Sequence, residues 1–316
     1  MQITIISYDN WGLNEHLKNV LEENGHTVCH INLFAFKHQY TNLSSKIYNF
    51  ISKTIFKKNI KGVYYGKEIL NKLSQNNEFQ DLILTIKGDF IDSDSILEFK
   101  KFGRKSIAFF NDSTERCPKI SKVIHAFDKV YSFEKKDCEK YNLNFITNWI
   151  YPMDSSNSNK NQLHLYNISS RDKRTSLLSK IARTLKENNI GYKIVIYDKK
   201  NRKQDPNLEY TSKPIPLNKV WEHLQNAKVL LDINRDKQNG LTFRVFESIG
   251  LEKKLITTNK DIQNYNFYNP NNILIIDEKN PIIPLTFFNT DYEKIPNHIV
   301  EEYSIKKWLH KILNQD

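Results

Sequence analysis

Cysteine is scarce in this chain, and its spacing argues against two classes of protein. The 316 residues include three cysteines, Cys29, Cys117 and Cys138, which lie far apart in the sequence. Small disulfide-stapled domains carry many paired cysteines, and structural zinc sites place cysteines a few residues apart. The chain fits neither class, and this usage of cysteine is typical of a reducing cytoplasm.

Glycine, proline and long apolar runs are scarce as well. The chain has nine glycines and nine prolines, and short apolar runs recur throughout, which argues against a disordered protein. No run approaches the roughly 18 apolar residues of a membrane-spanning helix. The N-terminus lacks the basic start and the apolar length of a signal peptide. We therefore expect a cytoplasmic globular protein.

Several common signatures are missing. The sequence contains no G-x-G-x-x-G, no G-x-x-x-x-G-K-[ST] and no G-x-S-x-G pattern. Their absence weakens the case for a dinucleotide dehydrogenase, a P-loop NTPase or a serine hydrolase. No pattern typical of an RNA- or DNA-binding module is present either, so we expect no nucleic-acid partner.

Basic charge is abundant. The formal net charge of +11 favours anionic partners such as phosphates or acidic lipid surfaces, although part of it follows from a composition rich in Lys, Asn and Ile. Residues 38–75 combine lysines with an apolar face that includes Ile47, Phe50, Ile51 and Ile55. This pattern predicts a basic amphipathic helix, which either packs on the protein as a surface helix or docks on an anionic bilayer.

Short apolar runs alternate with helical patterns along the whole chain. The first half includes a predicted helix over 119–127 and a last strand over 144–152, and a polar stretch at 154–162 is typical of a linker. The alternation starts again after this linker. It predicts an α/β protein of two doubly wound, Rossmann-like domains that face a ligand-binding cleft.

The stretch NGLTFRVFE, residues 239–247, lies between the apolar runs 229–234 and 254–259. In a doubly wound sheet it leaves the carboxyl end of a strand, where ligands bind. Gly240 would let a ligand approach the backbone closely, and Thr242 is a good N-cap for the helix that follows. The start of this helix is a suitable site for an anion such as a diphosphate.

Glu247 lies on the same face of this helix as Phe243 and Phe246. A carboxylate on an apolar face is costly unless something binds it. Either Glu247 is structural, held by backbone amides or by Arg244, or it binds a ligand, for example through ribose hydroxyls.

The exits of two strands in the first half carry candidate acceptor-side residues. Asp9, Asn10 and Gly12 follow the first apolar run, and Asp112 follows the run at 105–110. Asp9 and Asp112 are candidate catalytic bases, and Asn10 with Gly12 would form a tight turn beside a sugar. The alternative for Asp9 or Asn10 is that it caps the helix that follows.

Three segments resemble GT-B glycosyltransferases of the CgeB-like branch, with a C-terminal domain of the glycosyl transferases group 1 type. They are residues 227–259, which carry most of the resemblance, and, more weakly, 127–141 and 172–185. The resemblance implies an N-terminal acceptor-side domain over 1–153 and a C-terminal nucleotide-sugar-binding domain over 163–300. It also implies that a final helix within 301–316 packs back on the N-terminal domain.

The resemblance implies roles for several residues. Related retaining enzymes carry a Glu-x7-Glu motif, whose second Glu matches Glu247 and whose first position is Asn239 here, a departure that puts the contact with the donor sugar in doubt. Arg174 and Arg244 match arginines that bind donor phosphates, although a solvated helix start is the alternative for Arg174. The implied donor-binding residues are Arg174, Asn239, Gly240, Leu241, Thr242, Arg244 and Glu247. Neither a metal ion nor another cofactor is implied.

We therefore expect a glycosyltransferase that moves a sugar from a nucleotide-sugar to a cell-envelope glycan or glycolipid, such as a lipopolysaccharide core or capsule. It would be cytoplasmic, with peripheral contact to the inner face of the cytoplasmic membrane. Two alternatives stay open: a sugar-nucleotide epimerase on the same fold, and a non-catalytic basic protein that binds polyanions.

Overall fold

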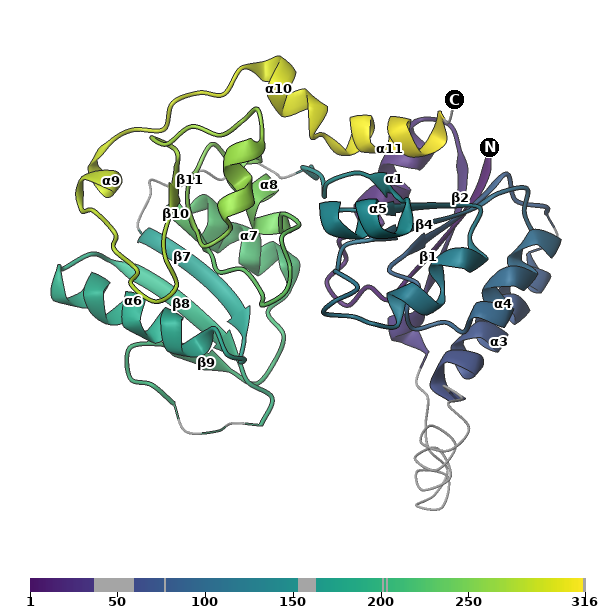
Figure 1. Cartoon of the computed structure of the whole chain (residues 1–316), viewed down its shortest axis with the longest axis horizontal. Coiled ribbons are helices and arrows are strands. Elements are labelled where there is room, and N and C mark those ends of the chain that lie inside the picture. The colour runs from purple at the N-terminus through teal and green to yellow at the C-terminus, as the bar shows by residue number, and fades with distance from the viewer. Residues whose placement is uncertain (37–59, 77, 153–162, 201, 203, 315–316) are drawn as a thin grey trace. The chain divides into compact units, whose positions relative to one another are not determined.

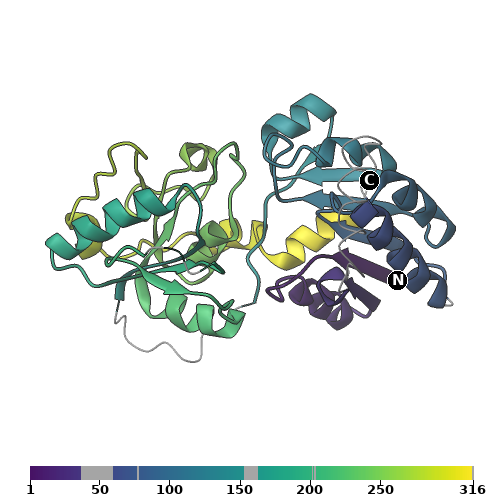
Figure 2. The same ribbon diagram turned by 90° about the horizontal axis from the view of Figure 1, so that it is seen from below.

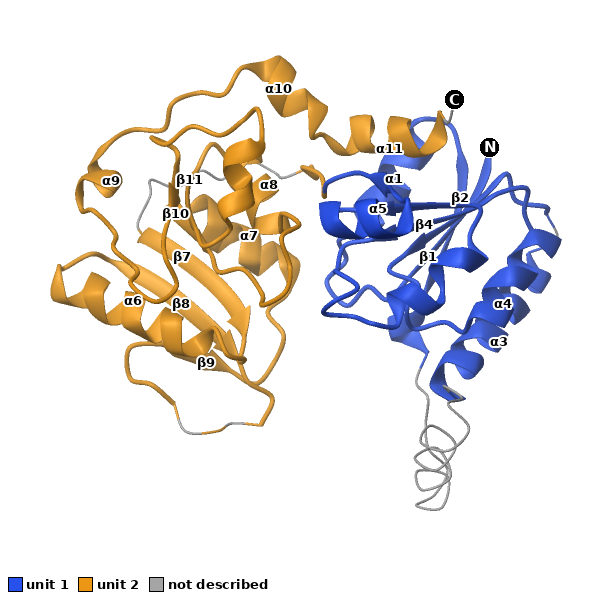
Figure 3. Cartoon of the chain, in the orientation of Figure 1, with its two compact units in different colours: residues 1–147 blue, residues 148–316 orange. Residues whose placement is uncertain are grey.

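The computed structural model describes residues 1–36, 60–76, 78–152, 163–200, 202 and 204–314 (Figure 1). The chain divides into two compact units, Met1–Thr147 and Asn148–Asp316 (Figure 3). Each unit is built around one six-stranded sheet in which every pair of neighbouring strands is parallel. These sheets confirm the predicted α/β class with two doubly wound domains. The predicted boundaries and the predicted packing of the last helix on the first domain stay predictions.

The sheet of the first unit has the strand order β2-β1-β3-β4-β5-β6. Its strands are β1 (Gln2–Ser7), β2 (Thr27–Asn32), β3 (Leu82–Ile86), β4 (Ser106–Phe110), β5 (Lys129–Ser132) and β6 (Asn144–Phe145). Its α-helices are α1 (Glu15–Glu23), α3 (Ile60–Gln75), α4 (Ser93–Leu97) and α5 (Lys135–Tyr141). The order reverses between β1 and β3, and this switch point is where doubly wound sheets bind ligands.

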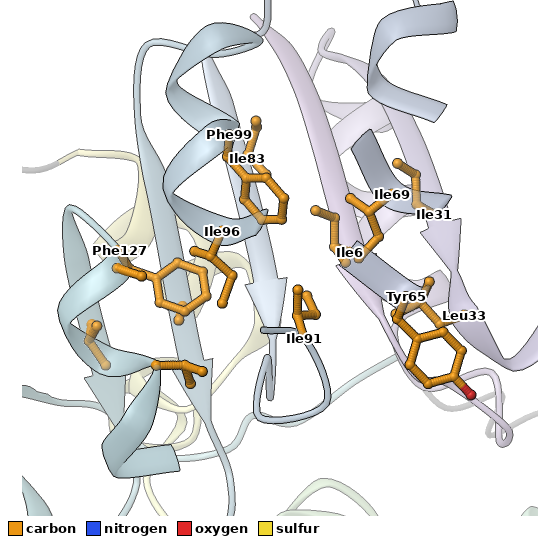
Figure 4. Packing of buried hydrophobic residues seen from close by; sticks show 14 of the residues in the cluster. Ile6, Ile31, Leu33, Tyr65, Ile69, Ile83, Ile91, Ile96, Phe99 and Phe127 are labelled. Atoms are coloured by element: carbon orange, nitrogen blue, oxygen red, sulfur yellow. The ribbon is translucent and has the colours of Figure 1, made fainter. Parts of the chain in front are cut away.

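The core of this unit lies between the sheet and its helices (Figure 4). Every residue of β3 and β4 is buried, as expected for central strands of a parallel sheet. Helix α3 contributes Tyr65, Ile69 and Leu73 to this core. The described part of the basic amphipathic segment is therefore a helix packed on its own protein, while Ile47 to Ile55 lie outside the described residues.

Two predictions in this unit are wrong. Residues 119–127 do not form one α-helix but two short 3-10 turns, Ile120–Lys122 and Ile124–Ala126. The buried apolar residues there, Ile120, Val123 and Ala126, recur every three residues, which is the period of a 3-10 helix. The predicted strand over 144–152 is reduced to β6 and a single bridge at Ile150.

The sheet of the second unit has the strand order β12-β11-β10-β7-β8-β9. Its strands are β7 (Leu163–Ser170), β8 (Tyr192–Tyr197), β9 (Glu209–Thr211), β10 (Ala227–Asp232), β11 (Lys254–Thr257) and β12 (Ile273–Ile275). Its α-helices are α6 (Thr175–Glu187), α7 (Leu217–Gln225), α8 (Phe243–Gly250), α9 (Thr286–Asn289), α10 (Asn297–Glu302) and α11 (Ile305–Leu313). The switch point of this sheet lies between β7 and β10.

Helices cover both faces of this second sheet (Figures 1 and 2). Helix α6 packs on the face that includes Leu165 and Leu231, whereas α7 and α8 pack on the face that includes Tyr166 and Leu230. Successive strand residues point to opposite faces, so a strand covered on both sides reads as a continuous apolar run. This is why the sequence predicts these strands well. Within the described residues, no helix is long and apolar enough to cross a membrane.

Candidate functional site

The switch point of the second unit brings together two loops that are far apart in the sequence. Strands β7 and β10 are neighbours, and they lead into α6 and α8, which lie on opposite faces of the sheet. At the start of α6, Nη1 of Arg174 donates to the carbonyl oxygen of Ile233, 3.0 Å away, at the end of β10. The structure therefore places Arg174 beside the loop 233–242.

Arg174 is held in this position from its other side. Its Nε and Nη2 donate to the carboxylate of Asp172, with Nη2 at 2.7 Å from Oδ2. Burial alone would raise the pKa of Asp172, but the hydrogen bonds and charge of Arg174 outweigh it and leave this pKa lowered. The charge of Arg235 acts in the same direction. The side chain of Arg174 is half-buried, with 15% of it exposed, and these contacts orient its guanidinium.

The loop 233–242 is also fixed by the strand on its other side. The hydroxyl of Thr258, just after β11, accepts a hydrogen bond from the backbone N–H of Asn234 at 2.8 Å. The side chain of Asn259 donates to the carbonyl oxygen of Asn239, also at 2.8 Å. Asn239 accepts this hydrogen bond through its backbone carbonyl oxygen. The bond therefore does not require a particular side chain at position 239.

Thr242 occupies the predicted N-cap position of α8 but does not cap the helix. Its hydroxyl donates instead to Oδ1 of Asp232, 2.9 Å away, and Thr257 donates to the other oxygen of that carboxylate. Asp232 is buried at the end of β10, and burial raises its pKa against the opposing effects of Thr242 and the charges of Arg244 and Arg174. The predicted capping hydrogen bond is therefore wrong: the side chain of Thr242 binds Asp232 and not the N–H groups of the helix.

Glu247 has protein partners on both carboxylate oxygens. Nη1 of Arg244 lies 2.7 Å from Oε2, and the hydroxyl of Tyr151 donates to Oε1. Trp221 in turn donates to the oxygen of Tyr151, at 3.2 Å. Burial raises the pKa of Glu247, opposed by the charge of Arg244 and the hydrogen bond from Tyr151. Burial together with the charge of Glu247 raises the pKa of Tyr151 as well.

This arrangement corresponds to the structural alternative for Glu247, with Arg244 as its partner. Sequence pattern alone does not connect Tyr151 with Glu247, because the two residues lie 96 positions apart along the chain. Arg244 also lies over the ring of Tyr166, with 5.9 Å from its Cζ to the ring centroid. A ligand that reaches Glu247 has to compete with Tyr151 or Arg244 for its oxygens.

Three buried amide oxygens around the loop have no hydrogen-bond partner within the described part of the chain. They are Oδ1 of Asn148, Oδ1 of Asn234 and Oε1 of Gln238. The other ends of two of these amides are tied to the loop itself: Asn148 donates to Leu241 and Asn234 donates to Gln238. An unpaired buried acceptor costs about 1–3 kcal/mol, so these oxygens suit a ligand that brings hydroxyl or N–H donors. No motif in the sequence points to these three residues.

In the first unit, Asp9 is engaged by the backbone of its own loop. Its carboxylate accepts hydrogen bonds from the N–H groups of Trp11, Gly12 and Asn14, at 3.0, 2.8 and 2.7 Å. Gly12 adopts a φ of +80°, which other residues rarely adopt, so the tight turn requires glycine there. Asn10 is exposed. Asp9 therefore holds the loop before α1, whereas the N-cap position of that helix is Asn14, which makes no side-chain capping hydrogen bond.

Asp112 lies just after β4, and cations engage both of its oxygens. Lys87 pairs with Oδ2 and Arg116 with Oδ1. Asp112 is 8% exposed, so its carboxylate is buried between these two cations. Among the described residues, no group of three or more His, Cys, Asp or Glu side chains could hold a metal ion.

Known structures share this fold at low sequence identity. A UDP-forming α,α-trehalose-phosphate synthase from Burkholderia xenovorans matches with a TM-score of 0.61 and 10% identity, covering 98% of this chain and 97% of that one. A glycosyltransferase from Rickettsia africae matches at 0.56 and 12%, covering 100% and 99%. A UDP-GlcNAc 2-epimerase from Methanocaldococcus jannaschii matches at 0.50 and 8%, with both chains covered fully.

No protein-family profile and no curated protein sequence matches the chain. The structural likeness shows that the chain has the GT-B fold, with the two Rossmann-like domains predicted from the sequence. At these identities the likeness extends to the fold alone, so the activity has to be argued from the site.

Proposed function

We propose that the chain is a glycosyltransferase that takes a sugar from a nucleotide-sugar bound at the switch point of the second unit. One observation carries the proposal: Arg174 and the start of α8 meet at the loop 233–242, and three buried amide oxygens there have no partner among the described residues. Cationic and N–H groups suit a diphosphate, and unpaired acceptors suit the hydroxyls of a sugar or ribose.

The chemistry of transfer follows from these groups. The departing nucleoside diphosphate gains negative charge as the glycosidic bond breaks, and a fixed cation and a helix start stabilise that charge where it develops. Arg174 is already oriented by Asp172 and Ile233, so little reorganisation is needed. Leu241 and Gly240 are both buried in the loop that leads into α8.

In this proposal Glu247 has one of two roles. It either accepts the ribose hydroxyls after Tyr151 turns away, or it orients Arg244 toward the phosphates while it stays bonded to Tyr151. The second role requires no rearrangement and is the one that we adopt. Asp9 and Asp112 are the two proposed bases. Loop N–H groups contact both oxygens of Asp9 and cations contact both oxygens of Asp112, so these contacts favour neither residue over the other.

For the acceptor we propose a cell-envelope glycan or glycolipid, such as a lipopolysaccharide core or capsule, with the protein in the cytoplasm and in peripheral contact with the membrane. The net charge of +11 and the lysines in and around α3 support contact with an anionic surface. We propose no metal ion and no other cofactor, because the cationic groups named above would carry the charge of the leaving group.

A thermal-shift panel with UDP, GDP, CMP, ADP and dTDP tests the donor site. A nucleotide at one hundred times its dissociation constant stabilises the folded state by about 2.7 kcal/mol, so one member of the panel should raise the melting temperature by several degrees. Arg174→Gln should remove most of this shift. Arg183→Gln, an exposed arginine on the same helix, should keep it. No shift with any nucleotide would contradict the proposal.

A sugar-nucleotide epimerase is the second candidate, because one structural neighbour is an epimerase and because Asn239 departs from the transferase motif. The two candidates differ in their products. An epimerase converts the nucleotide-sugar into its epimer without any acceptor, whereas a transferase releases the nucleoside diphosphate together with a glycosylated acceptor. A non-catalytic polyanion-binding protein would instead show salt-sensitive binding of polyanions and no response to nucleotides.

A further inference from the structure

Three aromatic rings, of which two are exposed and one is half-buried, lie along the carboxyl edge of the sheet in the first unit. Tyr8 directly follows β1, Phe34 lies just after β2 and Phe90 lies just after β3. The ring centroid of Tyr8 is 5.8 Å from that of Phe34 and 6.2 Å from that of Phe90. Tyr8 is 42% exposed and Phe34 is 54% exposed. We refer to these three residues as the aromatic row.

The position of the aromatic row suggests that it binds a ligand. Strands β2, β1 and β3 are neighbours, so the row spans about 10 Å along the edge of the sheet. It crosses the switch point between β1 and β3, where doubly wound sheets bind their ligands. Phe90 also packs against the core and against Tyr65, which anchors the row. Adjacent exposed rings on a rigid support are typical of a recognition surface rather than of core packing.

The neighbouring part of the same edge presents positive charge. Lys87 begins the segment that carries Phe90, and it pairs with Asp112, which follows the next strand, β4. Lys87 is 38% exposed and Arg116 is 28% exposed, whereas Asp112 between them is 8% exposed. The cations therefore face solvent and their carboxylate lies beneath them. Asp89 lies in the same region, where burial raises its pKa against the smaller, opposing effect of the charges of Lys87, Lys119 and Arg116. Three cations and two carboxylates therefore leave this part of the edge positive.

We propose that this edge of the first unit binds a saccharide that carries an anionic group, with a sugar ring on the aromatic row and a phosphate or carboxylate on Lys87 and Arg116. The C–H face of a sugar ring packs well on the electron-rich face of an aromatic ring, and the cations complement an anion on that sugar. The inference rests on the proposed function in that this saccharide would be the acceptor, so it narrows the acceptor class to anionic sugars.

Calorimetric titration of the full chain tests the site with four probes: glucose 6-phosphate, glucuronate, glucose and inorganic phosphate. The titrations are run with and without UDP. We expect glucose 6-phosphate or glucuronate to bind, and glucose and inorganic phosphate to bind at least tenfold more weakly. This result would show that the site recognises the sugar ring and its anionic group together. The comparison of glucose 6-phosphate with glucuronate would show whether the site prefers a phosphate or a carboxylate.

Variants separate the two parts of the site. Tyr8→Ala and Phe34→Ala remove exposed rings and should weaken binding of the anionic sugar by about tenfold each. Lys87→Asn should lower it to the level of glucose. Asparagine is chosen because Lys87 has a φ of +76°, a conformation that asparagine tolerates. Phe79→Ala is the matched control, since Phe79 is 59% exposed and precedes β3 rather than following it.

The nucleotide response of each sample is measured at the same time. Wild-type protein that responds to a nucleotide but binds none of the sugars would overturn this inference and leave the proposed function intact. Sugar binding that is unchanged in Tyr8→Ala and Phe34→Ala, or weakened equally by Phe79→Ala, would also overturn it. Sugar binding without any nucleotide response would sustain the site and contradict the proposed donor site.

Discussion

At the scale of single residues, the site of the second unit depends on buried charges that hold one another. Arg244 and Glu247 form an ion pair, and Tyr151 donates a hydrogen bond to the other oxygen of Glu247. The hydroxyl of Thr242 donates to Asp232 and does not cap the helix. Removing one partner of such a network leaves a buried polar group unpaired, which costs more than the hydrogen bond itself contributes. Substitutions that remove a single polar or charged group from this network should therefore change the stability of the protein.

Tyr151→Phe removes one hydroxyl and keeps the ring. Glu247 then loses a hydrogen-bond donor and Trp221 loses its acceptor, so we expect the free energy of unfolding to fall by about 1–3 kcal/mol. Urea unfolding measures this change. Tyr141→Phe, at a half-buried tyrosine of α5, serves as the control and should cost less than about 0.5 kcal/mol. Equal stability of Tyr151→Phe and wild type would show that the network is not structural.

Asp232 predicts a dependence of stability on pH. Its pKa is raised in the folded state by burial, so between the unfolded and folded pKa values the folded protein binds more protons than the unfolded one. The contribution of Asp232 to stability therefore increases as pH falls through the folded pKa toward the unfolded value. Asp232→Asn removes this term.

The difference in unfolding free energy, wild type minus Asp232→Asn, should rise as pH is lowered from 7 toward 5. Urea unfolding of both proteins at pH 7, 6 and 5 measures it. A difference that stays constant, or that falls on acidification, would mean that Asp232 does not titrate as its burial requires.

At the scale of elements, close approach between helices sets the framework of the first unit. A Cβ atom added at Gly66 of α3 would lie 2.1 Å from Oγ and 2.4 Å from Cβ of Ser95 on α4. Gly66 is therefore needed for packing, although glycine lowers the propensity of the helix. In the second unit, Thr258 and Asn259, which follow β11, hold the loop 233–242 in place through hydrogen bonds to its backbone.

Gly66→Ala should destabilise the protein by about 1–3 kcal/mol through overpacking, even though alanine favours a helix by about 1 kcal/mol. Lys67→Ala, at the adjacent exposed position, should be close to neutral. The double variant Gly66→Ala with Ser95→Gly should recover part of the loss, because it makes room for the new methyl group. Thermal or urea unfolding distinguishes these outcomes, and a stabilised Gly66→Ala would rule out the close contact.

At the scale of the whole molecule, much of the fold can be predicted from the sequence. Parallel strands covered on both faces, such as β3, β4 and β10, are continuous apolar runs and are easily recognised. The short edge strand β9 and the 3-10 turns near Ile120 are missed, because three residues carry too little periodicity for an assignment. Which strands become neighbours depends on contacts across the whole unit.

The candidate site, too, has residues that the sequence predicts and residues that only the three-dimensional contacts show. Thr242, Arg244 and Glu247 could be selected because they lie in one motif after a strand, and Arg174 because it lies at the start of the helix after another strand. Arg174 contacts the loop that carries Thr242. Their partners could not be selected, since Tyr151 reaches Glu247 of α8, and Asn148 reaches Leu241 of the loop, from nearly one hundred residues away. The sequence shows which residues are unusual for their position, and only the three-dimensional contacts show what satisfies them.

The most direct test of the central claim is hydrogen–deuterium exchange of the full chain, with and without the nucleotide that the thermal-shift panel selects. We predict that the nucleotide slows exchange most strongly in residues 233–247 and in 171–178, the two segments that meet at the switch point between β7 and β10. Protection centred elsewhere in the chain, with these two segments unchanged, would contradict the assignment of the donor site and the function built on it.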